Sequence, residues 1–204
     1  MPKKSADKIV ITGGPSGGKT TLIEALQKEM GSVVAIIPEA ASILYRGGFP
    51  RIKSKAGLFH AQRSIYGVQK ELEELIEEEN PKAELIICDR GSLDSIAYWP
   101  QSEDHFFKAL KTTRTKELSR YQWVIHLDTA SRPYYDSTNP IRTESFNEAT
   151  LLNEKVKKAW RGHAHRLVVS QNKDFMSKMT LSLEVIRAIL DGSSLQQIHE
   201  QLLK

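Results

Sequence analysis

The sequence predicts an α/β fold in which a five-stranded parallel sheet is covered by helices on both faces. Short, nearly continuous aliphatic runs alternate along the chain with longer amphipathic stretches. The runs lack the polar alternation of a half-exposed strand, as expected for strands buried on both faces. Amphipathic stretches between such strands indicate helices that connect parallel neighbours, which gives a doubly wound sheet.

Each predicted element rests on its own pattern. The predicted strands are Ile9–Thr12, Val33–Ile37, Leu85–Cys88, Trp123–Leu127 and Leu167–Val169. Apolar residues spaced three or four apart indicate helices in the intervals between them. The helical stripes are Leu22, Leu26 and Met30; Ala61, Ile65, Val68, Leu72 and Leu75; Ala149, Leu152, Val156 and Trp160; Met176, Met179, Leu183, Ile186 and Leu190; and Leu195, Ile198 and Leu202. A capping box at Ser145–Glu148 and a terminal glycine, Gly192, bound two of these helices.

The composition fits a single domain over residues 1–204. Hydrophobic residues make up 40% of the chain and charged residues 26%, values that exclude a disordered or collagenous chain. No apolar run approaches the roughly 20 residues of a transmembrane helix, and no apolar signal region follows the charged N-terminus. The single cysteine excludes an intrachain disulfide, so we expect a cytoplasmic protein. A net charge of +4 is too small to predict nucleic-acid binding.

The segment Gly13–Thr20 matches the phosphate-binding pattern G-x-x-x-x-G-K-[ST] in full, between the first predicted strand and the first predicted helix. Backbone amides of such a loop form a nest for phosphate oxygens, and the helix N-terminus adds partial positive charge. We expect Lys19 to reach the β- and γ-phosphates and the Thr20 hydroxyl to bind Mg²⁺. The motif therefore predicts a P-loop NTPase fold. The nucleotide-binding residues that it assigns are Gly13, Gly14, Pro15, Ser16, Gly17, Gly18, Lys19, Thr20 and Thr21.

Asp89 and Arg90 directly follow the third predicted strand. A carboxylate at the end of a hydrophobic strand usually orients Mg²⁺ or its water, so Asp89 is the expected second magnesium ligand. Kinases of nucleosides and nucleotides often carry an acidic residue followed by arginine here, which makes Arg90 a candidate contact to the acceptor or the transferred phosphate. Two alternatives remain open. Asp89 could cap the next turn with Arg90 on the surface, and Asp128 could be the metal-side carboxylate.

Glu39 follows the second predicted strand, where the carboxyl ends of parallel strands line the binding crevice. A carboxylate there could act as a general base by accepting the proton of a substrate hydroxyl. The alternative is an ordinary glutamate at the start of a helix.

Residues 40–70 contain six basic residues and no acidic residue. They include Arg46 and Arg51, which flank the turn-forming segment 47–50. This pattern suits a mobile loop that binds an anionic acceptor, so Arg46 and Arg51 are the candidate acceptor-binding residues. The alternative is a solvated surface balanced by the acidic run 71–79.

The polar segment at about 129–145 follows the fourth predicted strand and contains Arg132 and Arg142. In small P-loop kinases a lid at this place closes arginines over the phosphates, so Arg142 is the candidate catalytic residue of the lid. An ordinary loop is the alternative. After the last strand, Ser170–Asp174 is one residue short of a guanine-reading motif, which favours ATP and leaves GTP possible.

Four segments together resemble a known family: Gly13–Thr20, Pro38–Ala41, Cys88–Gly91 and Asn139–Glu144. They are similar to AAA-type P-loop ATPases and kinases that include the nicotinamide-riboside kinase domain of NadR and the related domain of the TRPL-translocation-defect protein. The resemblance extends over about residues 8–190. It implies an ATP or GTP site, Mg²⁺ and a core like that of a nucleoside kinase. Members of the family are diverse, so the substrate does not carry over.

The expected function is that of a small-molecule kinase, which transfers the γ-phosphate of MgATP to a hydroxyl of a nucleoside-like or other anionic acceptor. The alternative is a nucleotide-dependent regulatory NTPase that binds a lipid or protein partner. An AAA+ motor is disfavoured because the remaining length holds no second helical domain. The identity of the acceptor and the oligomeric state stay open.

Overall fold

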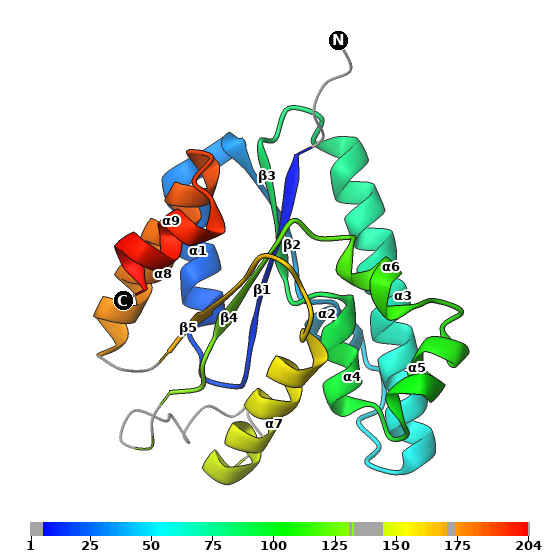
Figure 1. The fold of residues 1–204 in the computed structure, drawn as a ribbon. Coiled ribbons are helices and arrows are strands. Elements are labelled where there is room, and N and C mark those ends of the chain that lie inside the picture. The colour runs from blue at the N-terminus through cyan, green and yellow to red at the C-terminus, as the bar shows by residue number, and fades with distance from the viewer. Residues whose placement is uncertain (1–5, 131, 133–144, 171–173, 204) are drawn as a thin grey trace.

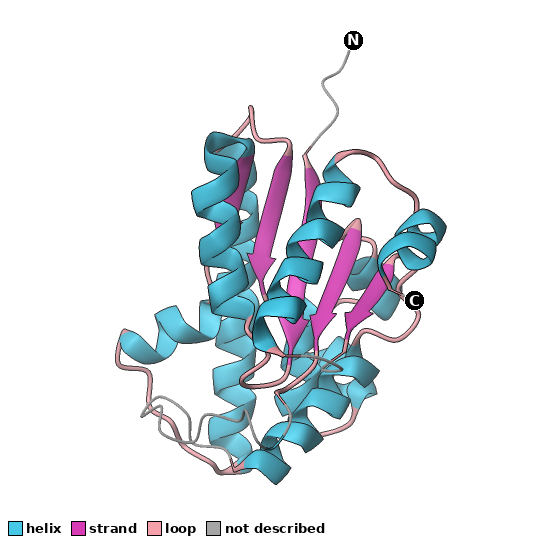
Figure 2. Cartoon of the chain, turned by 90° about the vertical axis from the view of Figure 1, so that its left-hand side faces the viewer, coloured by secondary structure: helices cyan, strands magenta, loops and turns pink. Residues whose placement is uncertain are grey.

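A computed structural model of the chain describes residues 6–130, 132, 145–170 and 174–203. In this part of the chain one five-stranded sheet forms the centre of the molecule. Its strands are β1 (Asp7–Gly13), β2 (Val34–Ile37), β3 (Leu85–Asp89), β4 (Trp123–Leu127) and β5 (Arg166–Val169). They lie in the order β2-β3-β1-β4-β5, and every neighbouring pair is parallel. Figure 2 shows their arrowheads pointing to the same end of the sheet. The predicted parallel sheet is confirmed.

Helices cover both faces of the sheet (Figure 1). One face carries α1 (Lys19–Met30), α8 (Phe175–Leu190) and α9 (Leu195–Leu202). The other face carries α3 (Lys55–Glu79), α4 (Ser95–Tyr98), α5 (Glu103–Ala109), α6 (Arg114–Leu118) and α7 (Phe146–Ala159). The short helix α2 (Ala40–Arg46) follows the carboxyl end of β2. The P-loop motif thus joins β1 to α1, as the sequence predicted.

Alternate side chains of the strands belong to two separate apolar layers, one on each face of the sheet, because neighbouring residues of a strand point to opposite faces. Ile9 and Ile11 pack with α1, α8 and α9, whereas Val10 packs with the helices of the other face. Cys88 belongs to the second layer and is 0% exposed. This cysteine is therefore a small core residue. Both layers are covered, which is why the strands read as nearly continuous apolar runs.

The structure departs from the sequence prediction in α3. The helix begins at Lys55, where Ser54 caps it by accepting a hydrogen bond from the Gly57 amide at 3.1 Å. Of the basic stretch 40–70, which we expected to form a mobile loop, only residues 47–54 therefore lie outside helices α2 and α3. The predicted apolar stripe is also rotated from the buried face, since Leu75 is 51% exposed. The residues that α3 buries are Ala61, Gln62, Tyr66, Gln69 and Glu73.

Two smaller departures concern the ends and the connections of strands. Val33 was assigned to a strand but lies in the 3₁₀ turn Gly31–Val33, with 37% of its surface exposed. Between β3 and β4 the chain forms the 3₁₀ turn Ser92–Asp94 and the helices α4, α5 and α6, which the sequence pattern did not predict. Within the described residues, no helix combines the length and the apolar character that crossing a membrane requires.

Candidate active site

The phosphate-binding loop packs directly against the carboxyl end of β4. A side chain at Gly13, where φ is 133°, would place its Cβ 2.0 Å from the backbone oxygen of Leu127. Ser16 and Gly18 also have positive φ, at 60° and 92°. The glycines are therefore needed for the close approach of the loop to the sheet and for its left-handed turns.

Several donors of this loop fit a phosphate group. Among the described residues, the amides of Ser16 and Gly18 have no backbone acceptor, and the buried Ser16 Oγ has no hydrogen-bond partner. Helix α1 starts with no acidic residue in its first turn, and its N-cap residue, Gly18, provides no capping side chain. Unsatisfied amides at a helix N-terminus attract anions. The residues present therefore fit the phosphates of a nucleotide.

Lys19 lies folded along the loop. Its Nζ donates to the backbone oxygens of Gly13 at 3.2 Å and of Gly14 at 2.8 Å, and only 9% of the residue is exposed. Burial, together with the positive charge of Arg90, lowers the pKa of Lys19 below its ordinary value. The side chain is thus held beside the loop by backbone carbonyls, close to the place where the motif expects phosphates.

Arg90 connects three segments that are distant in the sequence. Its Nε donates to Oε1 of Glu39 at 2.6 Å, and its Nη1 donates to Oδ2 of Asp94 at 3.0 Å. The same Nη1 donates to the backbone oxygen of Gly13 at 3.2 Å. The structure therefore brings the predicted residues Glu39 and Arg90 into direct contact, beside the phosphate-binding loop.

Glu39 occupies the N-cap position of α2, but its side chain makes no capping hydrogen bond. One carboxylate oxygen accepts from Arg90, and the other accepts from the Ser42 hydroxyl. Burial alone would raise the pKa of Glu39, but Arg90 and Ser42 outweigh burial and lower it. Glu39 therefore stands at the start of a helix, as the alternative has it, but its ionised carboxylate points at Arg90 instead of capping the helix.

Asp89 is the carboxylate that stays available for a ligand. Among the described residues it has no hydrogen-bond or ion-pair partner, and burial followed by the charge of Glu39 raises its pKa to about 6. Thr20 lies exposed at the start of α1. The described residues contain no cluster of three or more metal-binding side chains. Two oxygen donors beside a phosphate loop nevertheless fit Mg²⁺, which usually binds one or two protein groups together with substrate phosphates.

Asp94 is a site residue that the sequence pattern did not reveal. It is 4% exposed and accepts hydrogen bonds from Thr12 Oγ1 at 2.7 Å and from Trp160 Nε1 at 2.6 Å, besides the ion pair to Arg90. Its spacing of four residues from Arg90 gave no usable signal, because that spacing brings side chains together on a helix, and Arg90 and Gly91 precede the 3₁₀ turn Ser92–Asp94. No predicted helix covered this segment.

Asp128 differs from Asp89 because it is already bound by donors. Its Oδ1 accepts from Asn153 Nδ2 at 2.8 Å and from Lys157 Nζ at 2.6 Å. Burial would raise the pKa of Asp128, but hydrogen bonds from His126, Asn153 and Lys157 lower it. The geometry thus favours Asp89 over Asp128 as the metal-side carboxylate. Asn153, which sequence reasoning missed, also accepts the Gly14 amide at 3.0 Å and so ties α7 to the phosphate loop.

Arg46 and Arg51 make no hydrogen bond or ion pair with the site residues described above. Arg46 is exposed at the end of α2, and Arg51 is exposed with its guanidinium carbon 4.3 Å from the Tyr45 ring centroid. Neither makes a hydrogen bond or ion pair to Glu39. Arg132 lies 5.6 Å from the Phe146 ring centroid. Arg142 and almost all of the predicted lid fall outside the described residues.

Comparisons with known proteins agree with this fold. A family model described as an AAA domain matches residues 8–178. A solved structure of deoxyadenosine kinase from M. mycoides with bound dATP matches with a TM-score of 0.60 and 16% identity, over 89% of this chain and 99% of that chain. A structure of the same kinase with the products dCMP and a flexible dCDP has a TM-score of 0.61 at the same identity and coverage. At this identity the likeness shows a shared fold. No curated protein matches the sequence.

Proposed function

Because this chain belongs to the AAA-domain family whose model spans residues 8–178, we propose that it is a P-loop kinase for a small molecule. The proposed reaction transfers the γ-phosphate of MgATP to a hydroxyl of a nucleoside-like or other anionic acceptor. A nucleoside-like acceptor is supported by the shared fold with solved structures of a deoxyadenosine kinase.

One observation carries the proposal: the backbone oxygen of Gly13 accepts hydrogen bonds from both Lys19 Nζ and Arg90 Nη1, each at 3.2 Å. The lysine belongs to the phosphate loop, and the arginine holds Glu39 through its Nε. Lys19, which suits the phosphate donor, and Arg90 thus share one backbone acceptor, and Arg90 in turn holds Glu39, which suits the hydroxyl of an acceptor. A transferring phosphoryl group needs both kinds of group within reach.

The residues suggest how the transfer would proceed. The acceptor oxygen attacks the γ-phosphorus, the bond from that phosphorus to the β–γ bridging oxygen breaks, and ADP leaves with the negative charge. The hydroxyl proton passes to the Glu39 carboxylate, which Arg90 keeps ionised and oriented. Lys19 and Arg90 stabilise the charge that develops on the phosphoryl oxygens. Thr20 and Asp89 would hold Mg²⁺, which neutralises phosphate charge when it is bound.

The test is an acceptor screen with γ-labelled ATP across nucleosides, nucleotides and sugars. We expect label transfer to one acceptor class, and Glu39→Gln should slow it by about 10²–10⁴-fold while leaving MgATP affinity nearly unchanged. ATP hydrolysis that no acceptor changes, together with a conformational response to nucleotide alone, would instead support the regulatory NTPase.

A further inference from the structure

Arg90 has a backbone conformation that needs support. Its φ is 71°, a left-handed value that residues other than glycine adopt rarely and keep only where their surroundings enforce it. Three contacts hold the peptide groups around it. The Arg90 amide donates to the Ile11 oxygen at 3.0 Å, the Arg90 oxygen accepts from Gln69 Nε2 at 3.3 Å, and the Ser92 amide donates to the Tyr121 hydroxyl at 2.9 Å.

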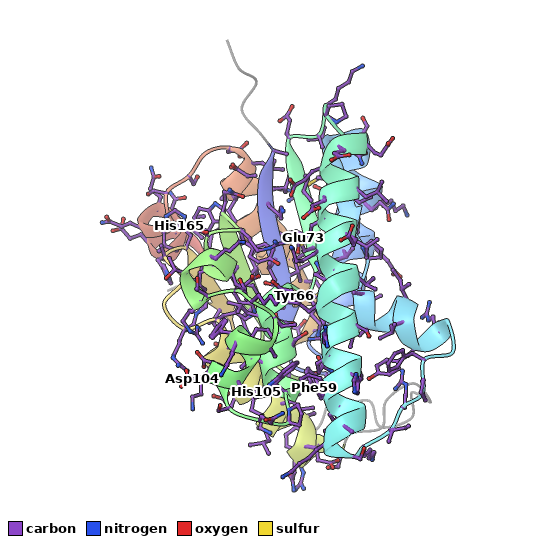
Figure 3. The ribbon with its side chains drawn as sticks, turned by 90° about the vertical axis from the view of Figure 1, so that its right-hand side faces the viewer. Phe59, Tyr66, Glu73, Asp104, His105 and His165 are labelled. Atoms are coloured by element: carbon purple, nitrogen blue, oxygen red, sulfur yellow. The ribbon has the colours of Figure 1, made fainter. Side chains whose placement is uncertain are left out.

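Two of these three contacts lead to the same carboxylate. Glu73 lies on the buried face of α3, where Figure 3 shows Phe59, Tyr66 and Glu73 in succession along the helix. Its Oε1 accepts from Gln69 Nε2 at 2.9 Å and from the Tyr121 hydroxyl at 2.7 Å. Glu73 is 0% exposed, although it belongs to the acidic run 71–79.

Cations keep this buried carboxylate ionised. Its Oε2 accepts from Arg120 Nη2 at 2.6 Å and from Lys8 Nζ at 3.1 Å. Burial would raise the pKa of Glu73, but Arg120 and Lys8 lower it. An ionised carboxylate only accepts hydrogen bonds, so every neighbour must donate to it.

The ionised state therefore sets the direction of each hydrogen bond. The Tyr121 hydroxyl proton must point at Glu73, which leaves its oxygen lone pairs to accept the Ser92 amide. One Gln69 amide hydrogen points at Glu73, which leaves the other for the Arg90 oxygen. The hydrogen bonds to the Arg90 oxygen and from the Ser92 amide thus both depend on the negative charge of Glu73, which lies on α3.

We propose that Glu73 is a positioning residue, which fixes the direction of the Arg90 side chain by holding, through Gln69 and Tyr121, the two peptide groups that follow Arg90. Its effect on catalysis rests on the proposed kinase function, because Arg90 is the arginine that would bridge donor and acceptor. Its effect on the conformation of Arg90 can be measured without any substrate.

Tyr121→Phe and Glu73→Gln test the proposal, with Tyr66→Phe as the matched control. Tyr66 lies on the same face of α3, and its hydroxyl donates to Glu117 at 2.7 Å, makes no contact with the Arg90 peptide, and among the described residues is connected to Glu73 only through Arg120, whose Nε lies 3.7 Å from the Glu117 carboxylate. Each tyrosine variant removes one buried hydroxyl that donates to a carboxylate. We therefore expect similar losses of stability in the two variants. If the network only stabilised the fold, the two variants would also change hydrogen exchange at Ser92 and Arg90 to a similar extent.

The readout is hydrogen exchange of the Ser92 amide and of Arg90 Nε–H by NMR, with the arginine resonance assigned from Arg90→Lys. We expect exchange about tenfold faster or more in Tyr121→Phe and Glu73→Gln, and nearly wild-type exchange in Tyr66→Phe. Equal exchange in the two tyrosine variants would overturn the positioning role, even if Glu73→Gln failed to fold.

Kinetics separate this inference from the proposed function. With an acceptor in hand, Tyr121→Phe should lower kcat by about tenfold and leave the KM for MgATP nearly unchanged, whereas Tyr66→Phe should match the wild type. If Tyr121→Phe speeds hydrogen exchange at Arg90 but leaves kcat unchanged, the proposed effect of Glu73 on catalysis is wrong. Failure to find any acceptor would count against the kinase proposal and leave the exchange result standing.

Discussion

Asp94 illustrates how single side chains determine the geometry of this site. Its carboxylate receives donors from β1, from the end of α7 and from Arg90, and it has almost no contact with solvent. A buried carboxylate in this setting acts as a fixed acceptor around which donors are arranged. The direction of the Arg90 guanidinium therefore depends on residues that would not touch a substrate.

Asp94→Asn should lower both stability and turnover. In either orientation the asparagine amide must point a donor at Arg90 or at Trp160, and neither of these two side chains can accept a hydrogen bond. We expect a loss of about 1–3 kcal/mol in the free energy of unfolding, measured in urea. Asp104→Asn in α5 is the control, because it removes the same charge from an exposed position. Wild-type stability of Asp94→Asn would contradict the network described above.

Asp89 should make the stability of the free protein depend on pH. Its folded pKa of about 6 lies above the ordinary value, so the folded state binds its proton more tightly. This group stabilises the fold fully below about pH 4, and its contribution is lost as pH rises to about 6. Asp89→Asn cannot lose a proton. Urea unfolding should therefore show the variant gaining stability relative to wild type between these pH values and a constant difference above them.

At the scale of elements, the strands were predictable and the helix faces were less so. Buried strands read as apolar runs, so all five strands were found to within two residues at either end. The apolar pattern failed for helix α3 because the helix buries the polar residues Gln62, Gln69 and Glu73. Glu73 is satisfied mainly by Lys8, Arg120 and Tyr121, which lie far away in the sequence. The helices between β3 and β4 are too short for a periodic pattern to emerge.

The same reasoning applies to the candidate site. The phosphate loop is a local motif, so its residues could be assigned from spacing alone. The contact of Glu39 with Arg90 spans 51 residues and depends on β2 lying beside β3, which no local pattern specifies. Asp94 was missed for the same reason, since its partners Thr12 and Trp160 lie 82 and 66 residues away in sequence.

Helix α2 and the connection 47–54 should form the acceptor side of the site. The carboxylate of Glu39 stands at the start of α2, and Arg46 and Arg51 lie at and beyond its end. Arg51→Ala and Arg46→Ala should raise the KM for an anionic acceptor by about tenfold each, if desolvated contacts to it are lost. MgATP affinity should stay nearly constant. Weakened MgATP binding in titration calorimetry would place this connection at the donor side instead.

At the scale of the whole molecule, the candidate site draws on segments that come together only in the complete sheet. The carboxyl ends of β1, β2 and β3 supply Gly13, Glu39 and Arg90 from distant parts of the chain. A ligand that binds there would contact elements from both apolar layers. Binding should therefore stabilise the fold as a unit.

MgATP should raise the melting temperature of the intact protein. At a concentration of 100 times Kd the stabilisation is about 2.7 kcal/mol, which corresponds to roughly 5–10 °C for a chain of this size. Lys19→Ala should remove most of this shift while the melting temperature of the free protein stays near that of the wild type. Differential scanning fluorimetry measures both. An undiminished shift in Lys19→Ala would show that the phosphate loop does not carry nucleotide binding.

Because Cys88 is buried, the protein is suited to site-specific labelling with fluorescent dyes. Cys88 is the sole cysteine of the chain, it is 0% exposed, and burial raises its pKa well above the ordinary value. Thiol reagents react with the exposed thiolate, so the native protein should take up almost no maleimide dye. Cysteines introduced at Leu151 on α7, which is 58% exposed, and at Ile43 on α2, which is 44% exposed, would then carry the only two labels. Energy transfer between the two dyes would report whether α7 and α2 approach each other when nucleotide and acceptor are added.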